Sequence, residues 1–218
     1  MKFNKPSKII LWLYIGTLAY WLIVAFGKVL FDGPTVHTLN LITQLPLAII
    51  PITGGIFGLR NSSAWGGQKS IVGRSTMSLS FGLLAWGTGM IFWNYYIFFT
   101  PISIPYPSFA DVGYVLGLFF FIVGIYQLWK AIGVRYALRN SLGKKLLLII
   151  PPVVVLISVY LLVIVARDGT LIQDHGSALK LFFDLLYPIG DVVLLTLASL
   201  SYILSRNFLG GVYKSVIL

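Results

Sequence analysis

Residues Leu146–Ala166 read LLLIIPPVVVLISVYLLVIVA and contain no charged side chain. As an α-helix this stretch would be about 30 Å long, because the helix rises about 1.5 Å per residue. That length matches the hydrocarbon core of a bilayer, which takes about 20 apolar residues to cross. The backbone finds no water to bond there, so a crossing segment of this kind has to be helical. The stretch therefore predicts a transmembrane helix.

Similar apolar stretches occupy most of the chain. Of its 218 residues, 58% are hydrophobic and only 10% are charged, and the mean hydropathy is +0.91. A soluble domain needs roughly 25% charged residues to cover its surface. We therefore expect an all-α fold, a single polytopic transmembrane helical bundle over residues 1–218. The six predicted spans are residues 9–31, 38–59, 71–99, 108–129, 146–166 and 181–204.

The basic residues predict how these spans are oriented. Every Lys and Arg except Lys28, Arg167 and Lys180 lies in a terminal segment or at the junction after the second or fourth span, and these segments hold no acid. Cytoplasmic loops of membrane proteins carry such an excess. Both termini are therefore predicted to be cytoplasmic, in a multi-pass protein of the cell membrane. The net charge of +10 is spread over short loops, which favours contact with anionic lipid at the cytoplasmic face and excludes nucleic acid as a partner.

The end of the chain has two interpretations. Residues 205–218 contain Arg206 and Lys214 but finish on the apolar run Val216–Leu218. The apolar part is too short to cross a bilayer. The segment is either a cytoplasmic tail or the start of a truncated seventh span.

Small residues recur at helical spacing in the predicted third and fourth spans. They are Ser78, Gly82, Ala85 and Gly89 in the third, and Gly113, Gly117 and Gly124 in the fourth. In lipid, small side chains let helix backbones approach closely. We expect tight packing between these spans, and the same pattern also suits a homodimer.

Asp191 is the acid that most needs a structural explanation, and two helix registers are open for it. If the last span starts at Leu181, Asp191 lies about 15 Å along the helix, where an ionised Asp costs about 2.5–3.5 kcal/mol. Asp184, Tyr187 and Asp191 would then share one face directed into the bundle. If the helix instead starts at Pro188, which suits a first turn, Asp191 is an ordinary N-terminal acid.

Asp111 offers a parallel at the start of the fourth span. Ser108 is a candidate N-cap, and Asp111 stands at the third helical position, as in a capping box. Pro107 to Asp111 and Pro188 to Asp191 therefore look like two versions of one helix start. Aromatic residues, among them Trp93 and Tyr96, fill the outer half of the third span and could surround an apolar or cationic ligand. The candidate ligand-binding residues are Asp111, Asp191, Trp93, Tyr96, Asp184 and Tyr187.

Several kinds of chemistry are excluded by composition. The chain has no Cys, and all of its acids are Asp, so thiol chemistry and Glu-based motifs are absent. His37 and His175 are isolated in external loops and make a poor metal site. No catalytic triad, phosphate-binding loop or dinucleotide-binding motif is present. We expect no catalytic residue, no metal, no cofactor and no enzymatic activity.

Four segments of the chain resemble a known membrane region. They are Gly58–Ser70, Leu83–Tyr96, Pro105–Tyr114, with the sequence PYPSFADVGY, and Leu186–Asp191, with the sequence LYPIGD. This pattern is similar to the N-terminal multi-pass membrane region of prokaryotic signalling proteins, found ahead of diguanylate cyclase or histidine kinase domains and also as uncharacterised stand-alone membrane proteins. The resemblance covers most of residues 50–205. It implies a sensory or regulatory membrane module, although this chain contains no output domain.

These observations favour one function over two others. The first is a sensory or regulatory module that binds an unknown small or lipid-like ligand and signals to a cytoplasmic partner. The second is a small transporter or channel with Asp191 in its pathway. The third is an intramembrane aspartyl protease, which needs two Asp sharing a proton. Pro188–Asp191 lacks the first Gly of a G-x-G-D motif, so the protease is the least favoured.

Overall fold

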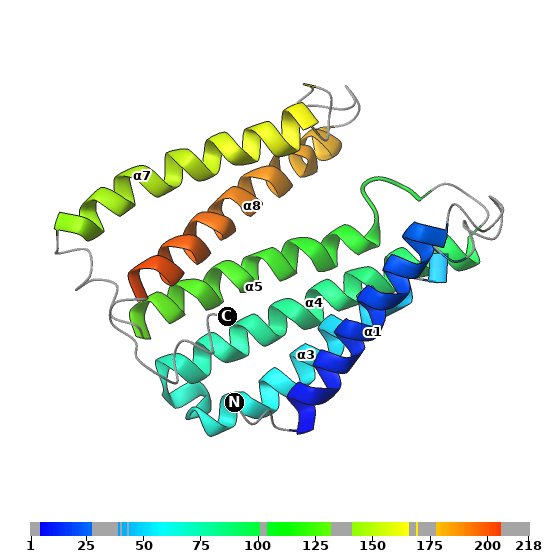
Figure 1. The fold of residues 1–218 in the computed structure, drawn as a ribbon, viewed down its shortest axis with the longest axis horizontal. Coiled ribbons are helices and arrows are strands. Elements are labelled where there is room, and N and C mark those ends of the chain that lie inside the picture. The colour runs from blue at the N-terminus through cyan, green and yellow to red at the C-terminus, as the bar shows by residue number, and fades with distance from the viewer. Residues whose placement is uncertain are drawn as a thin grey trace. The chain divides into compact units, whose positions relative to one another are not determined.

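The computed structural model describes residues 5–27, 39, 41, 42, 44–100, 104–131, 141–165, 169 and 178–205. Within these ranges the regular structure is entirely helical, as predicted (Figure 1). The elements are α1 (Lys5–Gly27), α3 (Gln44–Ala64), the short 3₁₀ helix η1 (Gly67–Lys69), α4 (Ile71–Phe99), α5 (Phe109–Ala131), α7 (Ser141–Ser158) with its π-helical continuation η2 (Val159–Val165), and α8 (Ala178–Ser205).

The helices agree with the predicted spans more closely at some ends than at others. Helix α4 has the predicted bounds, and α5 differs from its prediction by at most two residues. Helix α3 continues to Ala64 and α7 begins at Ser141, because a helix does not have to end where its apolar stretch ends. Residues 206–218, the ends of the first and fifth predicted spans, and both His residues lie outside the described part of the chain.

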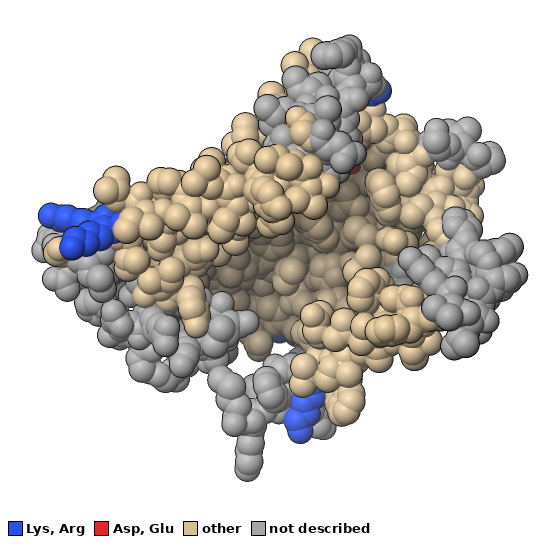
Figure 2. Space-filling model, turned by 45° about the horizontal axis from the view of Figure 1, so that its top comes forward, with Lys and Arg blue, Asp and Glu red and all other residues tan. Residues whose placement is uncertain are grey.

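Within the described ranges, four helices are long and apolar enough to cross a membrane. They cover Lys8–Phe26, Phe109–Ala131, Gly143–Leu161 and Ala178–Ile203. Helices α3 and α4 are also long, with 21 and 29 residues, but their Gly, Ser, Thr and Asn residues lower their hydropathy. The exposed surface is correspondingly poor in charge, and Figure 2 shows one face on which Lys, Arg, Asp and Glu occupy only small areas.

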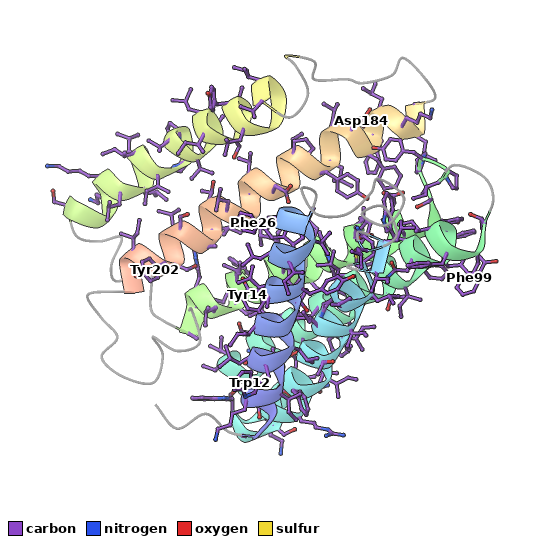
Figure 3. The ribbon with its side chains drawn as sticks, turned by 45° about the vertical axis from the view of Figure 1, so that its right-hand side comes forward. Trp12, Tyr14, Phe26, Phe99, Asp184 and Tyr202 are labelled. Atoms are coloured by element: carbon purple, nitrogen blue, oxygen red, sulfur yellow. The ribbon has the colours of Figure 1, made fainter. Side chains whose placement is uncertain are left out.

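Helix α1 presents large apolar side chains on nearly all sides. Trp12 is 70% exposed and Phe26 is 75% exposed, and both extend away from the helix axis in Figure 3. Only 6% of the apolar stretch of this helix, Lys8–Phe26, is buried. In water such a surface would be an aggregation hazard, whereas in lipid it needs no cover.

The chain divides into two compact units. The first contains Met1–Arg60 and Ser80–Gly117, and the second contains Asn61–Leu79 and Leu118–Leu218. Helices α3, α4 and α5 each contribute residues to both units. The two units are described separately below.

In the first unit, helices α3, α4 and α5 pack through small residues. A Cβ placed on Gly113 of α5 would lie 2.6 Å from the backbone N of Gly89 in α4. A Cβ placed on Gly87 of α4 would lie 2.5 Å from the side chain of Ile52 in α3, and one on Gly58 would overlap Ser80. Backbones this close leave no room for larger residues, which confirms the predicted tight packing of the glycine-bearing faces.

In the second unit, α5, α7 and α8 share a small apolar core. Its buried members are Leu128, Ile150, Val154 and Leu200. Trp129 of α5 donates its indole N–H to the Leu197 carbonyl of α8 at 3.1 Å and also contacts the Ser201 hydroxyl. Helices α7 and α8 run side by side in Figure 1. Helix α4 joins this unit through Ser75, which donates to the Gly124 carbonyl at 2.8 Å.

A tight turn joins α3 to α4 in the second unit. Gly66 and Gly67 have φ values of 86° and 53°, a left-handed conformation that glycine adopts without steric cost. Ser70 then caps α4, because its hydroxyl oxygen accepts the Gly73 N–H at 2.8 Å. The turn places the two helices as antiparallel neighbours.

Candidate functional site

Asp111 is fully engaged in starting helix α5. The Ser108 N–H donates to Asp111 Oδ2 at 2.6 Å, and the Ser108 hydroxyl donates to the same oxygen at 3.1 Å. The Ala110 N–H donates to Ser108 Oγ at 3.2 Å. This reciprocal pattern confirms the predicted capping box. Since Asp111 is only 7% exposed, the cap accounts for its burial without a ligand.

Asp191 lies in the interior of α8, and one of its two predicted registers is wrong. Helix α8 begins at Ala178 and continues through Pro188, so Pro188 does not start a helix. Its ring lacks the N–H that would bond the Asp184 carbonyl and crowds that carbonyl, but the helix continues past it. Asp191 is therefore about 20 Å along the helix. The proposed likeness between the starts at Asp111 and Asp191 is wrong for the same reason.

The acidic face of α8 is only partly directed inward. Asp184 is 4% exposed and Tyr187 is half-buried, but Asp191 is exposed. Helical spacing fixes the side of the helix on which a side chain lies. It does not determine whether another helix covers that side chain at its position along the axis. Figure 3 marks Asp184 near the start of α8.

Trp93 and Tyr96 are half-buried in the last two turns of α4. Their neighbour Tyr95 lies 6.0 Å from the Tyr96 ring and stacks at 5.9 Å on Phe99, the last residue of the helix (Figure 3). Other aromatic contacts connect α4 to α5, with Trp86 5.0 Å from Tyr114. The Tyr95, Tyr96 and Phe99 rings cluster at the end of α4, whereas the contact between Trp86 and Tyr114 lies near the middle of that helix.

The six predicted ligand-binding residues are divided between the two units. Asp111, Trp93 and Tyr96 belong to the first unit, and Asp184, Tyr187 and Asp191 belong to the second. A single site built from all six remains a prediction.

A cavity between α3 and α4 was not predicted, and it lies wholly in the first unit. It is open to the surface of the helix pair, and its volume is about 320 Å³. Most of its lining side chains are themselves exposed, Phe99 to 76%. Its lining residues are Leu45, Ala48 and Ile49 of α3, and Ile91, Asn94, Tyr95, Phe98 and Phe99 of α4. Apart from Asn94 and the Tyr95 hydroxyl, every described side chain that lines it is apolar. Small-molecule sites commonly have this composition, with few polar groups in an apolar wall.

Asn94 is the distinctive residue of this cavity. It is 7% exposed, and its Nδ2 donates to the Gln44 carbonyl at the start of α3 at 3.2 Å. Its Oδ1 is buried and has no hydrogen-bond partner among the described residues. A buried acceptor without a partner costs about 1–3 kcal/mol. The sequence shows an amide side chain within a run of aromatic residues. Whether the oxygen of that amide finds a hydrogen-bond partner depends on the position of α3, which the sequence pattern does not give.

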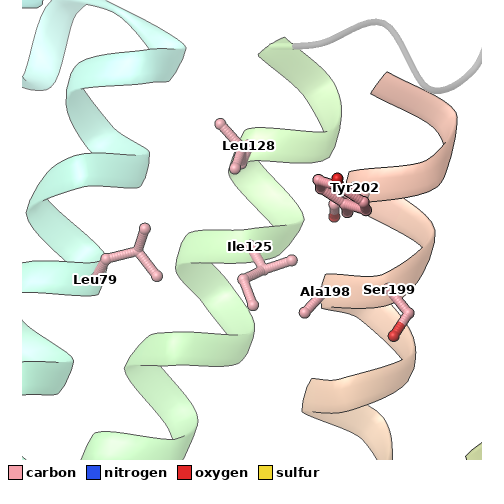
Figure 4. Close-up of a pocket in the computed structure, with 7 residues that line it drawn as sticks. Leu79, Ile125, Leu128, Ala198, Ser199 and Tyr202 are labelled. Atoms are coloured by element: carbon pink, nitrogen blue, oxygen red, sulfur yellow. The ribbon is translucent and has the colours of Figure 1, made fainter. Parts of the chain in front are cut away.

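The second unit contains another cavity, of about 450 Å³, between α4, α5 and α8 (Figure 4). Its walls include Leu79, Ile125 and Ala198. Its buried polar atom is already bonded, because the Ser201 hydroxyl donates to the Leu197 carbonyl at 2.6 Å. This cavity therefore lacks the unmet hydrogen-bonding capacity that distinguishes the one at Asn94.

Within the described ranges, no group of three or more His, Cys, Asp or Glu residues could hold a metal ion. Comparison of the chain with protein-family models, with curated proteins and with solved structures gives no match.

Proposed function

We propose that this chain is a sensory or regulatory module of the cell membrane, with six spans and both termini in the cytoplasm. The four long apolar helices and the exposed apolar surface of α1 support membrane insertion. The alternation of basic residues supports the orientation. The resemblance to membrane regions of prokaryotic signalling proteins supports a role in sensing.

One observation carries the proposal of a ligand. Asn94 Oδ1 is a buried acceptor without a described partner on the wall of an apolar cavity. Native proteins seldom leave such a group unmet, and the exceptions call for an explanation such as an absent molecule. A ligand that donates a hydrogen bond there would remove the penalty.

The same cavity offers a route to a signal. Its floor is Ala48, whose carbonyl oxygen would lie 3.3 Å from a Cβ on Gly87. Beyond that contact α3 and α4 touch closely through Gly55 and Gly58. A ligand entering between the helices cannot compress this packed contact, because protein interiors resist compression. The helices would instead pivot about it, and the movement would reach the α3–α4 turn at Gly66.

The proposal is tested by measuring that movement on the full chain in lipid nanodiscs. The chain has no Cys, so spin labels on Cys residues replacing Ser63 of α3 and Ile71 of α4 would be the only ones. We expect 1-decanol, a chain with one hydroxyl, to shift the interlabel distance by about 1–2 Å, the scale of helix shifts in switching proteins. An unchanged distance in a chain that binds the probe would contradict the sensory role.

A matched variant separates specific from general effects of the probe. Asn94→Leu removes the acceptor and keeps an apolar wall of similar size. We expect this variant to show no shift at the same decanol concentration. A shift equal to that of the unaltered chain would mean that the alcohol acts through the bilayer.

A transporter or channel is the second candidate, and the position of Asp191 favours it. The residue lies in the middle of a continuous α8, about 20 Å from its start, and it is exposed. A carboxyl group at that depth is commonly part of an ion or proton path. Proton or cation flux into liposomes that hold the chain, lost in Asp191→Asn, would support this function. Liposomes with no flux above protein-free controls would exclude it.

A further inference from the structure

We infer that the α3–α4 cavity binds a neutral amphiphile whose head donates a hydrogen bond to Asn94 Oδ1 and whose apolar chain fills the rest of the space. This inference rests on the proposed function for its ligand site, but it does not require that binding produce a signal. It specifies the chemical class of the ligand from three properties of the cavity: its acceptor, its lack of charge and its volume.

The orientation of the Asn94 amide follows from its hydrogen bond to a described residue. Nδ2 donates to the Gln44 carbonyl at 3.2 Å. The reverse orientation would place two oxygens against each other, because a carbonyl oxygen only accepts. Oδ1 therefore points away from Gln44. The unmet atom is an acceptor, so the ligand must supply a donor such as a hydroxyl or an amide N–H.

The wall of the cavity selects a neutral head. Its described members are aliphatic or aromatic apart from Asn94 and the Tyr95 hydroxyl, and none of them is Lys, Arg or Asp. Among these described lining residues a carboxylate would find no cation, and an ammonium would find no anion. Burial of an unpaired charge is far more costly than burial of a hydroxyl that is hydrogen-bonded. The charges that a phospholipid head carries are therefore disfavoured.

Water is a poor alternative occupant. A buried water usually makes about three hydrogen bonds. The Asn94 side chain offers one free oxygen and the second hydrogen of Nδ2, and most of the remaining wall is apolar. A molecule with one polar end and an apolar body matches this wall better than a cluster of waters.

The volume sets how much of the ligand the cavity can hold, because the cavity is open to the surface of the helix pair. A water occupies about 30 Å³ of liquid, so a cavity of about 320 Å³ holds on the order of ten non-hydrogen atoms. That corresponds to a medium-chain alcohol, or to the hydroxyl end of a longer neutral lipid whose remaining chain extends into the bilayer. Both sources share the same chemistry, one hydroxyl on an apolar chain.

The test uses a photoreactive decanol that carries a diazirine on its chain, with the full-length protein in nanodiscs. We expect crosslinks on the α3 and α4 residues that line the cavity. Unlabelled 1-decanol should suppress these crosslinks about tenfold more effectively than decyl methyl ether, which has the same chain but no donor. The factor corresponds to one net hydrogen bond. Equal suppression by the ether, or crosslinks spread evenly over all helices, would overturn the inference.

Two variants and a lipid complete the design. Asn94→Leu should lose most of the crosslinking, whereas Asn61→Leu, which replaces an exposed amide of α3 outside the cavity, should retain it. If Asn94→Leu does not fold, the comparison of alcohol and ether on the unaltered chain still tests whether the ligand donates a hydrogen bond.

Dioleoylglycerol that competes as well as decanol identifies a membrane lipid as the source of the ligand, and competition by decanol alone identifies a free amphiphile. Crosslinking without any change in the spin-label distance would support this inference and contradict the sensory proposal.

Discussion

At the scale of single residues, Asp111 and Asn94 differ in whether their polar atoms find partners nearby. Asp111 is satisfied by Ser108, three residues away in the sequence. Asn94 bonds Gln44, fifty positions away, and its oxygen is left over. Local hydrogen bonds can be predicted from spacing, and that is why the cap of α5 was predictable and the orphaned amide was not.

Replacing Asp111 should weaken the start of α5. In Asp111→Ala the Ser108 N–H loses its acceptor, and loss of a capping side chain typically costs about 1 kcal/mol. We expect a lower midpoint of unfolding in SDS and faster amide hydrogen exchange at residues 108–111, with little change in decanol binding. Asp111→Asn retains an acceptor oxygen and should lose less. A loss of decanol binding with unchanged stability would instead give Asp111 a direct role at the ligand.

Filling the cavity without touching the amide is a second residue-scale prediction. Ala48 is buried on the cavity floor, so Ala48→Leu would place several extra carbons in the space. We expect decanol crosslinking to fall about tenfold or more, because the ligand and the new side chain cannot occupy the same volume. Crosslinking equal to that of the unaltered chain would show that the probe binds elsewhere.

At the scale of elements, close packing between helices depends on positions where only glycine fits. The spacing of small residues predicted which faces of α4 and α5 would meet, because that spacing places them on one side of each helix. The end of α3 and the start of α7 were predicted less well. Charged and polar residues at those ends continue the helix beyond its apolar stretch, so hydropathy alone does not locate the boundary.

Gly113→Ala tests the packing of α4 against α5. Its new Cβ would lie 2.6 Å from the Gly89 backbone, and overpacking of this kind costs about 1–3 kcal/mol. Gly16→Ala in α1 is the matched control, because nothing lies within 4 Å of its Cβ position, and the change should stabilise the helix by about 0.5–1 kcal/mol. Unfolding in SDS should show opposite shifts for the two variants. If Gly113→Ala left the resistance to unfolding in SDS unchanged, α4 and α5 would not be in close contact.

Pro188→Ala tests the continuity of α8. In a helix that runs from Ala178 to Ser205, the substitution restores an N–H to the Asp184 carbonyl and should raise the resistance to unfolding. If the helix started at Pro188, the substitution would remove a residue suited to the first turn and lower it. The sign of the change, compared with the unaltered chain, distinguishes the two registers.

At the scale of the whole molecule, hydropathy and the charge pattern predict different numbers of membrane crossings. Four helices are long and apolar enough by composition, and α3 and α4 are equally long but richer in small and polar residues. The charge pattern predicts that all six cross, because Arg60, Lys69 and Arg74 would otherwise lie outside. Hydropathy averages over a helix, whereas the positive-inside rule uses the loops between helices, so the two signals can differ.

The location of Lys69 tests this account most directly. It lies in η1, between α3 and α4, and a single Cys placed there in the otherwise Cys-free chain can be probed with a membrane-impermeant maleimide on intact cells. Six spans place position 69 in the cytoplasm, so labelling should appear only after permeabilisation, while a Cys at Lys180 is labelled from outside. If only α1, α5, α7 and α8 cross, position 69 lies outside and is labelled at once, which would contradict the six-span membrane module and the signalling route through the α3–α4 turn.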